Sequence, residues 1–209
     1  MDGSPNKKGE ASAARERWNQ KYRESPRAWR TPDPFLLWAY AEYILPAFPR
    51  GGGALDLAGG TGRHAIWLAG QSEEAALWEV TLIDISETGV ALAKQNAGPL
   101  APRIRFVVDD LTQFKASQTR FDVVMAFFYL ERNIFPEILK TLRPGGLLIY
   151  KTVTLAQAKL PAGPKNPAYS LKPGELLQLP TGLRILHYQE EIVDKATAEL
   201  VARKEIEPK

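Results

Sequence analysis

The sequence contains no cysteine, only two histidines and no long apolar run. Without cysteine the chain can form neither a disulfide framework, nor a thiolate metal site, nor a cysteine nucleophile. Two histidines are too few for a histidine metal site of the usual kind, so no metal is expected. No apolar run reaches the ~18 residues of a membrane span. The first 14 residues, MDGSPNKKGEASAA, lack the apolar core of a signal peptide. These absences together favour a cytoplasmic protein without a membrane segment.

The sequence also lacks an excess of charge of one sign. Its net charge is +3, acids and bases are interleaved, and no run of five like charges occurs. Because nucleic-acid-binding proteins usually present a basic face or stripe, the composition favours a small molecule over a nucleic acid as partner. A length of 209 residues predicts one domain. Residues 1–14 are small and polar, so we expect a disordered tail there and the folded domain over residues 15–209.

The most informative stretch is GALDLAGGTGRHA, from Gly53 to Ala65. It predicts a buried strand that ends at Asp56, a glycine turn, and a helix whose first free N–H groups point at a ligand. Glycines at 59, 60 and 62 allow positive φ and let a ligand approach the backbone. A carboxylate beside the turn is unfavourable for a pyrophosphate and favourable for a ligand that carries an ammonium group.

Further strands and helices alternate along the chain. A carboxylate at the end of the second strand, about 20 residues past the glycine turn, can accept hydrogen bonds from ribose hydroxyls. Ser86 is the expected N-cap of the next helix. The alternation predicts an α/β fold with a doubly wound, mostly parallel seven-stranded sheet and an antiparallel last strand. The remaining predicted strands are Glu79–Asp84, Arg103–Val108, Phe121–Phe127, a fifth strand fed by a turn within Leu142–Thr152, Leu183–Gln189 and Glu199–Glu205.

Five elements in this order resemble the class I S-adenosylmethionine-dependent methyltransferases, which have a Rossmann-like fold. They are LDLAGGTG, the strand-end Asp84, Asp110 after FVV, FDVVMAF and LRPGGLL. RWNQKY, YLERNIF and NPAYSLKPGELL are similar to the small tellurite-resistance-type methyltransferases within that class. The resemblance implies S-adenosylmethionine as cofactor, S-adenosylhomocysteine as product, and methyl transfer by in-line displacement.

The resemblance also implies how the cofactor is bound. Asp56 would reach its amino group, directly or through water, and the Phe127 carbonyl would lie near the same group. Asp84 would hold the ribose hydroxyls and Asp110 the adenine amino group, although a shift of one residue would exchange Asp110 for Asp109. The other cofactor residues would be Ala58, Gly59, Gly60 and Gly62 around the methionine part, Ile85 and Leu111 at adenine, and Trp18 and Tyr22 on a helix over the site. The alternative for the two strand-end acids is a helix N-cap, and for the two aromatic residues simple packing.

Acceptors in this class bind after the fourth strand, where Tyr129 and Arg132 lie. Arg132 could pair with an anionic acceptor or with a nearby acid. Tyr169 lies in a Pro-rich loop predicted over Leu160–Pro173, which is either a binding loop or a surface connection. His64 could act as a general base or merely satisfy backbone groups, and His187 is expected to be structural. Methyl transfer from a sulfonium needs alignment more than a proton-transferring group, so no obligatory catalytic residue is predicted.

The chain has MAFFYLE where enzymes that methylate adenine, cytosine or glutamine carry an Asn/Asp-Pro-Pro-Tyr-like motif. This favours a small acceptor with an intrinsically good nucleophile: a thiol, a selenol or a chalcogen oxyanion. Three alternatives remain. One is a non-catalytic S-adenosylmethionine-binding protein, and another is a methyltransferase that acts on a nucleic acid or a protein. The third is a nicotinamide oxidoreductase, because residues 60–65 satisfy the loose G-x-G-x-x-A pattern.

Overall fold

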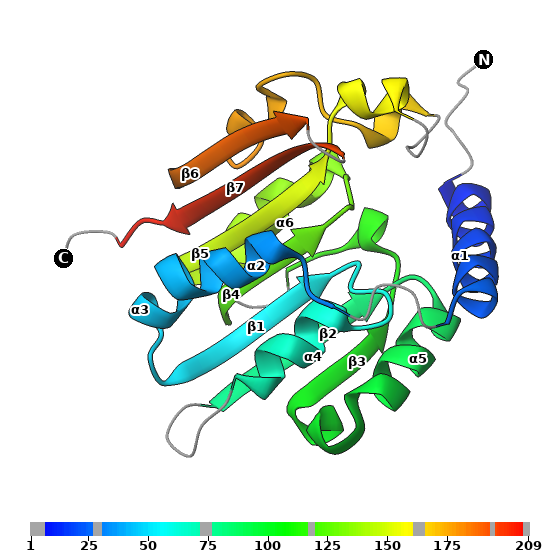
Figure 1. Ribbon diagram of the computed structural model, residues 1–209, viewed down its shortest axis with the longest axis horizontal. Helices are drawn as coiled ribbons and strands as arrows, with labels where there is room; N and C mark the ends of the chain where they lie inside the picture. The colour runs from blue at the N-terminus through cyan, green and yellow to red at the C-terminus, as the bar shows by residue number, and fades with distance from the viewer. Residues whose placement is uncertain are drawn as a thin grey trace.

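Seven strands form one sheet at the centre of the computed structural model, which describes residues 7–26, 31–71, 77–116, 120–160, 166–192 and 195–206. The strand order is β3-β2-β1-β4-β5-β7-β6 (Figure 1). Strands β1 to β5 run parallel, while β7 lies antiparallel between β5 and β6, which confirms the predicted sheet. The strands are β1 Gly51–Leu57, β2 Leu77–Asp84, β3 Ile104–Val108, β4 Phe121–Phe127, β5 Leu142–Val153, β6 Leu183–Ile192 and β7 Ala196–Lys204.

Helices cover both faces of the sheet (Figure 1). One core cluster joins α2, α4 and α5 to one face, and a second joins α6 and residues 171–176 to the other. The helices are α1 Lys7–Glu24, α2 Pro34–Ala39, α3 Leu45–Ala47, α4 Arg63–Gly70, α5 Glu87–Ala97 and α6 Phe135–Thr141; a π-helical turn, Tyr40–Ile44, joins α2 to α3. None of the helices among the described residues is long and apolar enough to cross a membrane.

Local sequence signals explain where two of these helices begin. Ser86 has extended backbone, and its side chain accepts a hydrogen bond from the N–H of Gly89, as the predicted N-cap of α5 should. Asp33 caps α2 in the same way and is followed by Pro34 at the first helical position. The N-terminal region differs from the prediction. Residues 7–14, expected in a disordered tail, form the first turns of α1, and residues 1–6 lie outside the described residues.

The winding of the sheet reverses between β1 and β4. The chain runs outward from β1 to β2 and β3, then returns to place β4 on the other side of β1. In open α/β sheets, ligands bind at the carboxyl ends of the strands at such a switch point. Two residues other than glycine adopt positive φ here: Ala58 (55°), after β1, and Phe128 (58°), after β4. Each costs on the order of 1–3 kcal/mol, and such strain concentrates at functional sites.

The predicted Pro-rich loop over Leu160–Pro173 contains one short 3₁₀ turn in its described part. One turn, Leu155–Lys159, precedes it, and a second, Pro167–Tyr169, lies within it. Asn166 caps the second turn by accepting a hydrogen bond from the N–H of Ala168. Residues 161–165 lie outside the described residues.

Candidate functional site

The glycine turn between β1 and α4 is held by its own backbone and by close packing. Gly60 and Gly62 have positive φ, 55° and 85°. The N–H of Gly62 donates to the carbonyl of Gly59 at 2.9 Å. A Cβ added to Gly59 would lie 2.7 Å from the side chain of Leu82, and one on Gly60 would lie 2.4 Å from the Tyr22 hydroxyl oxygen. The missing Cβ atoms therefore serve the packing of the turn as well as the predicted approach of a ligand.

Asp56 is the last residue but one of β1, which runs one residue further than predicted and ends at Leu57, and its side chain is buried. Its Oδ2 accepts a hydrogen bond from the backbone N–H of Ala65, in the first turn of α4, at 3.2 Å. Burial raises the pKa of this carboxyl to about 7, although the Ala65 hydrogen bond and the charge of Arg63 act in the opposite direction. Asp56 is thus a buried acid without a cationic partner within ion-pair distance in the described chain. With a pKa of about 7, it populates both its protonated and its charged form near neutral pH.

Asp84 ends β2 at the adjacent position in the sheet and is also buried. Its Oδ2 accepts from the N–H of Gly60 at 2.8 Å, and its Oδ1 accepts from the N–H of Ser86 at 2.9 Å. Burial raises its pKa, and these backbone hydrogen bonds oppose the shift. The carboxylate therefore links the glycine turn to the start of α5. The N–H of Ile85 acts on the same carboxylate, and since a carboxylate has about four lone-pair sites, at least one remains for a ligand donor.

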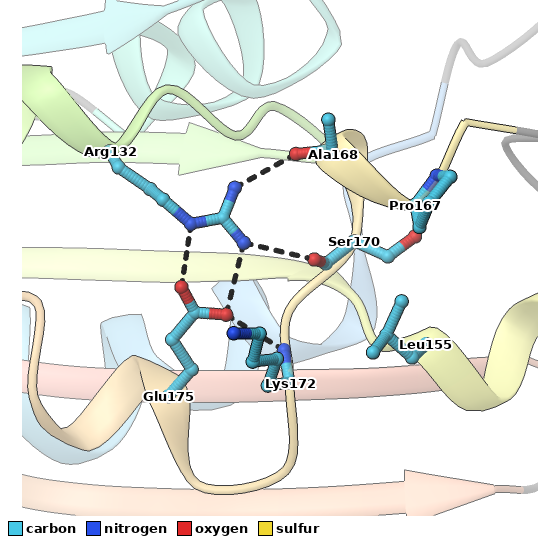
Figure 2. A pocket seen from close by; sticks show the side chains of 7 residues that line it. All are labelled: Arg132, Leu155, Pro167, Ala168, Ser170, Lys172 and Glu175. Carbon is cyan, nitrogen blue, oxygen red and sulfur yellow. Dashed lines mark hydrogen bonds and ion pairs between the residues drawn. The ribbon is translucent and has the colours of Figure 1, made fainter.

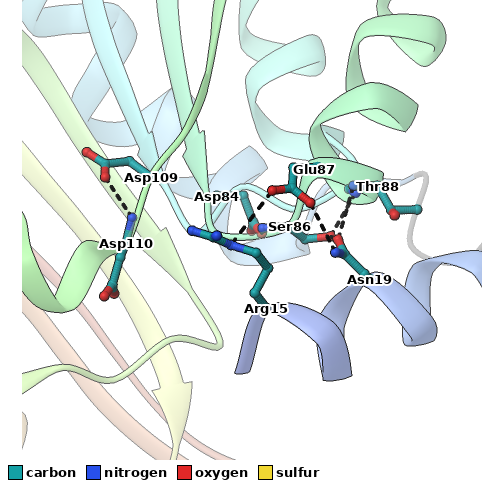
Figure 3. Close-up of polar contacts among 9 residues, drawn as sticks. Arg15, Asn19, Asp84, Ser86, Glu87, Thr88, Asp109 and Asp110 are labelled. Carbon is teal, nitrogen blue, oxygen red and sulfur yellow. Dashed lines mark hydrogen bonds and ion pairs between the residues drawn. The ribbon is translucent and has the colours of Figure 1, made fainter. Parts of the chain in front are cut away.

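Helix α1 is joined to the start of α5 by a set of polar contacts (Figure 3). Asn19 Oδ1 accepts from the hydroxyl of Ser86 at 2.6 Å and from the N–H of Thr88 at 3.2 Å. Its amide donates to Glu87 at 3.3 Å, and Arg15 Nε lies 3.8 Å from the same carboxylate. A side chain that satisfies two donors and one acceptor at once fixes the position of its helix.

The predicted pair Trp18 and Tyr22 shares one face of α1, with the two rings stacked at 5.6 Å. Tyr22 is buried, and its ring and hydroxyl would contact any Cβ added at Gly60 or Gly89. Burial and the charge of Asp84 both raise the pKa of this phenol, so it stays protonated and neutral. The helix therefore lies directly over the glycine turn, as the resemblance implied.

The third strand brings two acids to the same edge (Figure 3). The N–H of Asp109 donates to the carbonyl of Asp84 at 3.0 Å, and its carboxylate accepts from the N–H of Asp110. Asp110 is half-buried and caps a 3₁₀ turn, Leu111–Gln113, by accepting from the N–H and the hydroxyl of Thr112. Asp109 is exposed, Ile85 is half-buried and Leu111 is buried. Either acid can still reach a ligand at this edge.

His64 is built into the core. It is buried, its ring lies 4.0 Å from the ring of Phe127, and its Nε2 accepts a hydrogen bond from the N–H of Asp33 at 3.2 Å. Burial and the neighbouring Arg63 lower its pKa to about 2. The imidazole is thus neutral, and its acceptor nitrogen already binds a backbone N–H, which was one of the two roles considered for it. No lone pair of the ring is left to act as a general base.

A charge network that the sequence analysis missed lies between α2 and the sheet. Lys151 Nζ is 3.1 Å from Asp33 Oδ1 and 3.1 Å from Glu199 Oε2. His187 lies 3.5 Å from the other oxygen of Glu199, and its ring is 4.5 Å from that of Trp38, in the structural role expected for it. The Asp-Pro pair at 33–34 is a readable helix-start signal. Lys151 lies in the apolar run LLIYKTV, and no sequence pattern there indicates an ion pair.

Arg132 is fully engaged within the chain (Figure 2). Its guanidinium forms a bidentate pair with Glu175, at 2.6 and 3.0 Å, and donates to the carbonyls of Ala168 at 2.8 Å and Ser170 at 3.1 Å. Of the two predicted partners, it has the nearby acid. These residues, together with Leu155, Pro167 and Lys172, line a cavity of about 300 Å³.

Tyr129 and Tyr169 take different positions. The carbonyl of Tyr129 accepts from the hydroxyl of Tyr150 at 2.5 Å. Burial and the charges of Glu131 and Asp110 raise the pKa of the Tyr129 phenol. The side chain of Tyr169 is half exposed, and it is not among the residues that line the cavity at Arg132. The structure thus gathers the predicted cofactor residues at one edge and leaves the predicted acceptor residues spread around it.

Comparison with known proteins supports a methyltransferase. Residues 54–146 match the profile of a family described as the methyltransferase domain. YqeM of Bacillus subtilis (strain 168), which is described as a methyltransferase by inference, is 30% identical over 126 residues. That match covers 56% of this chain, and the chain spans about half, 48%, of the length of this curated relative.

Several solved structures share the fold. A structure reported for the conversion of a disulfide bond into a thioacetal group during echinomycin biosynthesis is 21% identical, with a TM-score of 0.70 over 93% of this chain and 94% of that one. The N-methyltransferase NodS from Bradyrhizobium japonicum WM9 is 18% identical, with a TM-score of 0.62 over 83% and 98%. A TehB-like S-adenosylmethionine-dependent methyltransferase from Corynebacterium glutamicum ATCC 13032 Kitasato is 21% identical, with a TM-score of 0.60 over 93% and 100%. The chain has the Rossmann-like fold of the class I methyltransferases.

Proposed function

We propose that this protein transfers a methyl group from S-adenosylmethionine to a small soluble acceptor. The observation that carries the proposal is the pair of buried acids, Asp56 and Asp84, at adjacent strand ends beside the glycine turn. They lie at the point where the winding of the sheet reverses. The methyltransferase-domain match over residues 54–146 covers both acids and supports the same cofactor. The proposed domain, expected over residues 15–209, also takes in residues 7–14, because α1, its cover, begins at Lys7.

The arrangement of donors and acceptors fits the cofactor. Asp56 has no cation within ion-pair distance in the described part of the chain, and an ammonium group would supply one. Asp84 accepts from backbone N–H groups and keeps at least one lone pair for a ribose hydroxyl. The proposed binding residues are Asp56, Ala58, Gly59, Gly60, Gly62 and Phe127 for the methionine part, Asp84 for ribose, Ile85, Asp110 and Leu111 for adenine, and Trp18 and Tyr22 as the cover.

The cofactor supplies the methyl group, the positive charge and the leaving group when it is bound. The chain must therefore hold donor and acceptor in line and exclude water. Helix α1 serves the second task, because Tyr22 closes directly onto the glycine turn. For the first task we point to Phe128, whose strained positive φ follows the end of β4 at the switch point, where such strain is typical of functional sites.

We further propose a thiol, a selenol or a chalcogen oxyanion as acceptor. His64 is neutral with its acceptor nitrogen occupied, and the raised pKa of Tyr129 keeps its phenol protonated. Without a ready base among these candidates, the acceptor must ionise easily or be nucleophilic when it binds. The likeness to the structure reported for conversion of a disulfide bond into a thioacetal group is consistent with sulfur chemistry.

Calorimetry with four ligands tests the cofactor: S-adenosylmethionine, S-adenosylhomocysteine, NADH and NADPH. Binding of the first two alone supports the proposal, and binding of only the dinucleotides overturns it. A methyl-transfer screen then tests the acceptor, with thiols, selenols and chalcogen oxyanions set against amines, a protein mixture and RNA. Cofactor binding without turnover on any acceptor would instead indicate a non-catalytic binding protein.

A further inference from the structure

Arg63 is an arginine whose guanidinium has no hydrogen-bond or ion-pair partner among the described residues. It is the first residue of α4, directly after the left-handed Gly62, and it is half-buried. Its guanidinium carbon lies 5.7 Å from the centroid of the Phe128 ring. Among the described residues, no hydrogen bond or ion pair within 4.0 Å reaches this side chain. A guanidinium has five N–H donors and no acceptor, and none of the Arg63 nitrogens is among the buried unpaired atoms, so these donors stay open to solvent or to a ligand.

Two acids lie near enough to act on Arg63 by their charge, and both already have other partners. Burial lowers the pKa of Arg63, while the charges of Asp33 and Asp56 raise it. Asp33 accepts from the N–H of Phe35 and from Lys151. Asp56 accepts from a backbone N–H at the start of α4. The guanidinium therefore remains available to an anion that enters from outside the chain.

The position of Arg63 beside Asp56 suggests which anion this is. The two residues stand on opposite sides of the glycine turn, one at the end of β1 and the other at the start of α4. An α-amino acid carries one ammonium and one carboxylate on the same carbon. A buried acid next to a free guanidinium is complementary to both groups, and arginine binds a carboxylate through two parallel hydrogen bonds.

We propose that Arg63 binds the α-carboxylate of the methionine part of the cofactor, while Asp56 binds its ammonium group. This inference rests on the proposed function and assigns to Arg63 the discrimination between the complete amino acid and a truncated nucleoside. The N–H of Ala65 is already taken by Asp56, so the backbone of α4 can add only the N–H groups of Arg63 and His64, at the end of the helix where a negative charge is favoured. The Phe128 ring contacts the guanidinium, and Lys195 Nζ lies 4.8 Å from the centroid of the same ring.

The test compares two ligands that differ only in the carboxylate: S-adenosylmethionine and its decarboxylated form. Affinities are measured by calorimetry for the full-length wild-type chain, Arg63→Met and Arg63→Lys. The control is Arg120→Met, because the Arg120 guanidinium also lies over an aromatic ring, 5.2 Å from Phe121, but at the other end of β4. If Arg63 only packs on a ring, both methionine variants should behave alike.

We expect the wild type to prefer S-adenosylmethionine over the decarboxylated ligand by tenfold or more. Arg63→Met should lose that preference by weakening only the complete cofactor, Arg63→Lys should keep part of it, and Arg120→Met should keep all of it. Equal weakening of both ligands by Arg63→Met, or unchanged affinity for S-adenosylmethionine, would overturn the inference. Absence of binding of either ligand to the wild type would overturn the proposed function itself, so the two failures are distinguishable.

Discussion

Replacing Asp56 by asparagine should make the protein more stable at alkaline pH while it removes cofactor binding. Asparagine has nearly the same shape, and its carbonyl can keep the hydrogen bond from the N–H of Ala65. What the substitution removes is a carboxyl whose pKa burial raises from 3.8 to about 7. An acid whose pKa is higher in the folded than in the unfolded state stabilises the folded state fully at a pH below its unfolded-state pKa. This contribution is lost as the pH rises through the folded-state pKa.

The size of the effect follows from the shift. The folded-state pKa of Asp56 lies about two pH units above pH 5. Over each of these units the wild type loses ~1.36 kcal/mol of folding free energy as the pH rises. The advantage of Asp56→Asn over the wild type should therefore be greater at pH 8 than at pH 5 by up to about 2.7 kcal/mol. Other titrating groups cancel in this difference, apart from Asp84, whose charge also raises the pKa of Asp56.

Urea denaturation of both proteins at pH 5 and pH 8 measures the difference, provided that the m-values agree. Asp122→Asn is the matched control, because this acid lies at the start of β4 and pairs with Arg143 at 3.0 Å. We expect it to give no gain at pH 8. A constant offset between Asp56→Asn and wild type at the two pH values would refute the reasoning, because Asp56 would then not titrate near neutrality.

Four other predictions concern binding and turnover. Asp84→Ala should weaken S-adenosylhomocysteine binding at least tenfold in calorimetry, and should also lower the midpoint of thermal unfolding, because the carboxylate holds two backbone N–H groups. Unchanged affinity in a folded variant would exclude the ribose contact. Affinity of the wild type for the same ligand should rise from pH 6 to pH 7.5 as Asp56 loses its proton, whereas a flat profile would contradict its pKa of about 7. His64→Ala should reduce turnover by less than the ~10²-fold typical of a lost general base, once cofactor affinity is corrected for. A thousandfold loss with the cofactor still bound would make His64 the base. Arg132→Ala and Glu175→Ala should have similar effects on the acceptor KM, and the double variant should add little, because the two side chains form one bidentate pair. Additive effects would mean that Arg132 binds the acceptor directly.

The sequence was sufficient for the sheet, because its signals are local and repeated. Each strand that ends in an acid, such as the one at Asp84, is followed by a turn and a helix start, and the structure confirms the Ser86 cap. The tail was different, because its polar composition predicted disorder where residues 7–14 extend α1. A helix that is stabilised by docking, as α1 is through Asn19, leaves little trace in composition.

The site was predictable to the extent that its residues lie on the glycine turn and at strand ends. Arg63 was within the quoted motif but was passed over, because only the structure shows that its guanidinium has no partner in the described chain. The role of Arg132 was left open between an acceptor and an acid, and the choice depended on Glu175, 43 residues away. Such pairings depend on the tertiary arrangement of loops, which no local pattern encodes.

The difference between paired and unpaired charges separates the scaffold from the site. Lys151, Asp33 and Glu199 satisfy one another between α2 and the sheet, and they fix the position of that helix. At the carboxyl ends of β1 and β4, by contrast, Asp56 and Arg63 lie near each other without an ion pair, beside strained backbone at positions 58 and 128. A fold that only needed stability would pair these charges or replace them with apolar residues. Because these unpaired charges and the strained backbone lie together at the switch point of the sheet, a ligand that carries both an ammonium and a carboxylate is their simplest physical explanation.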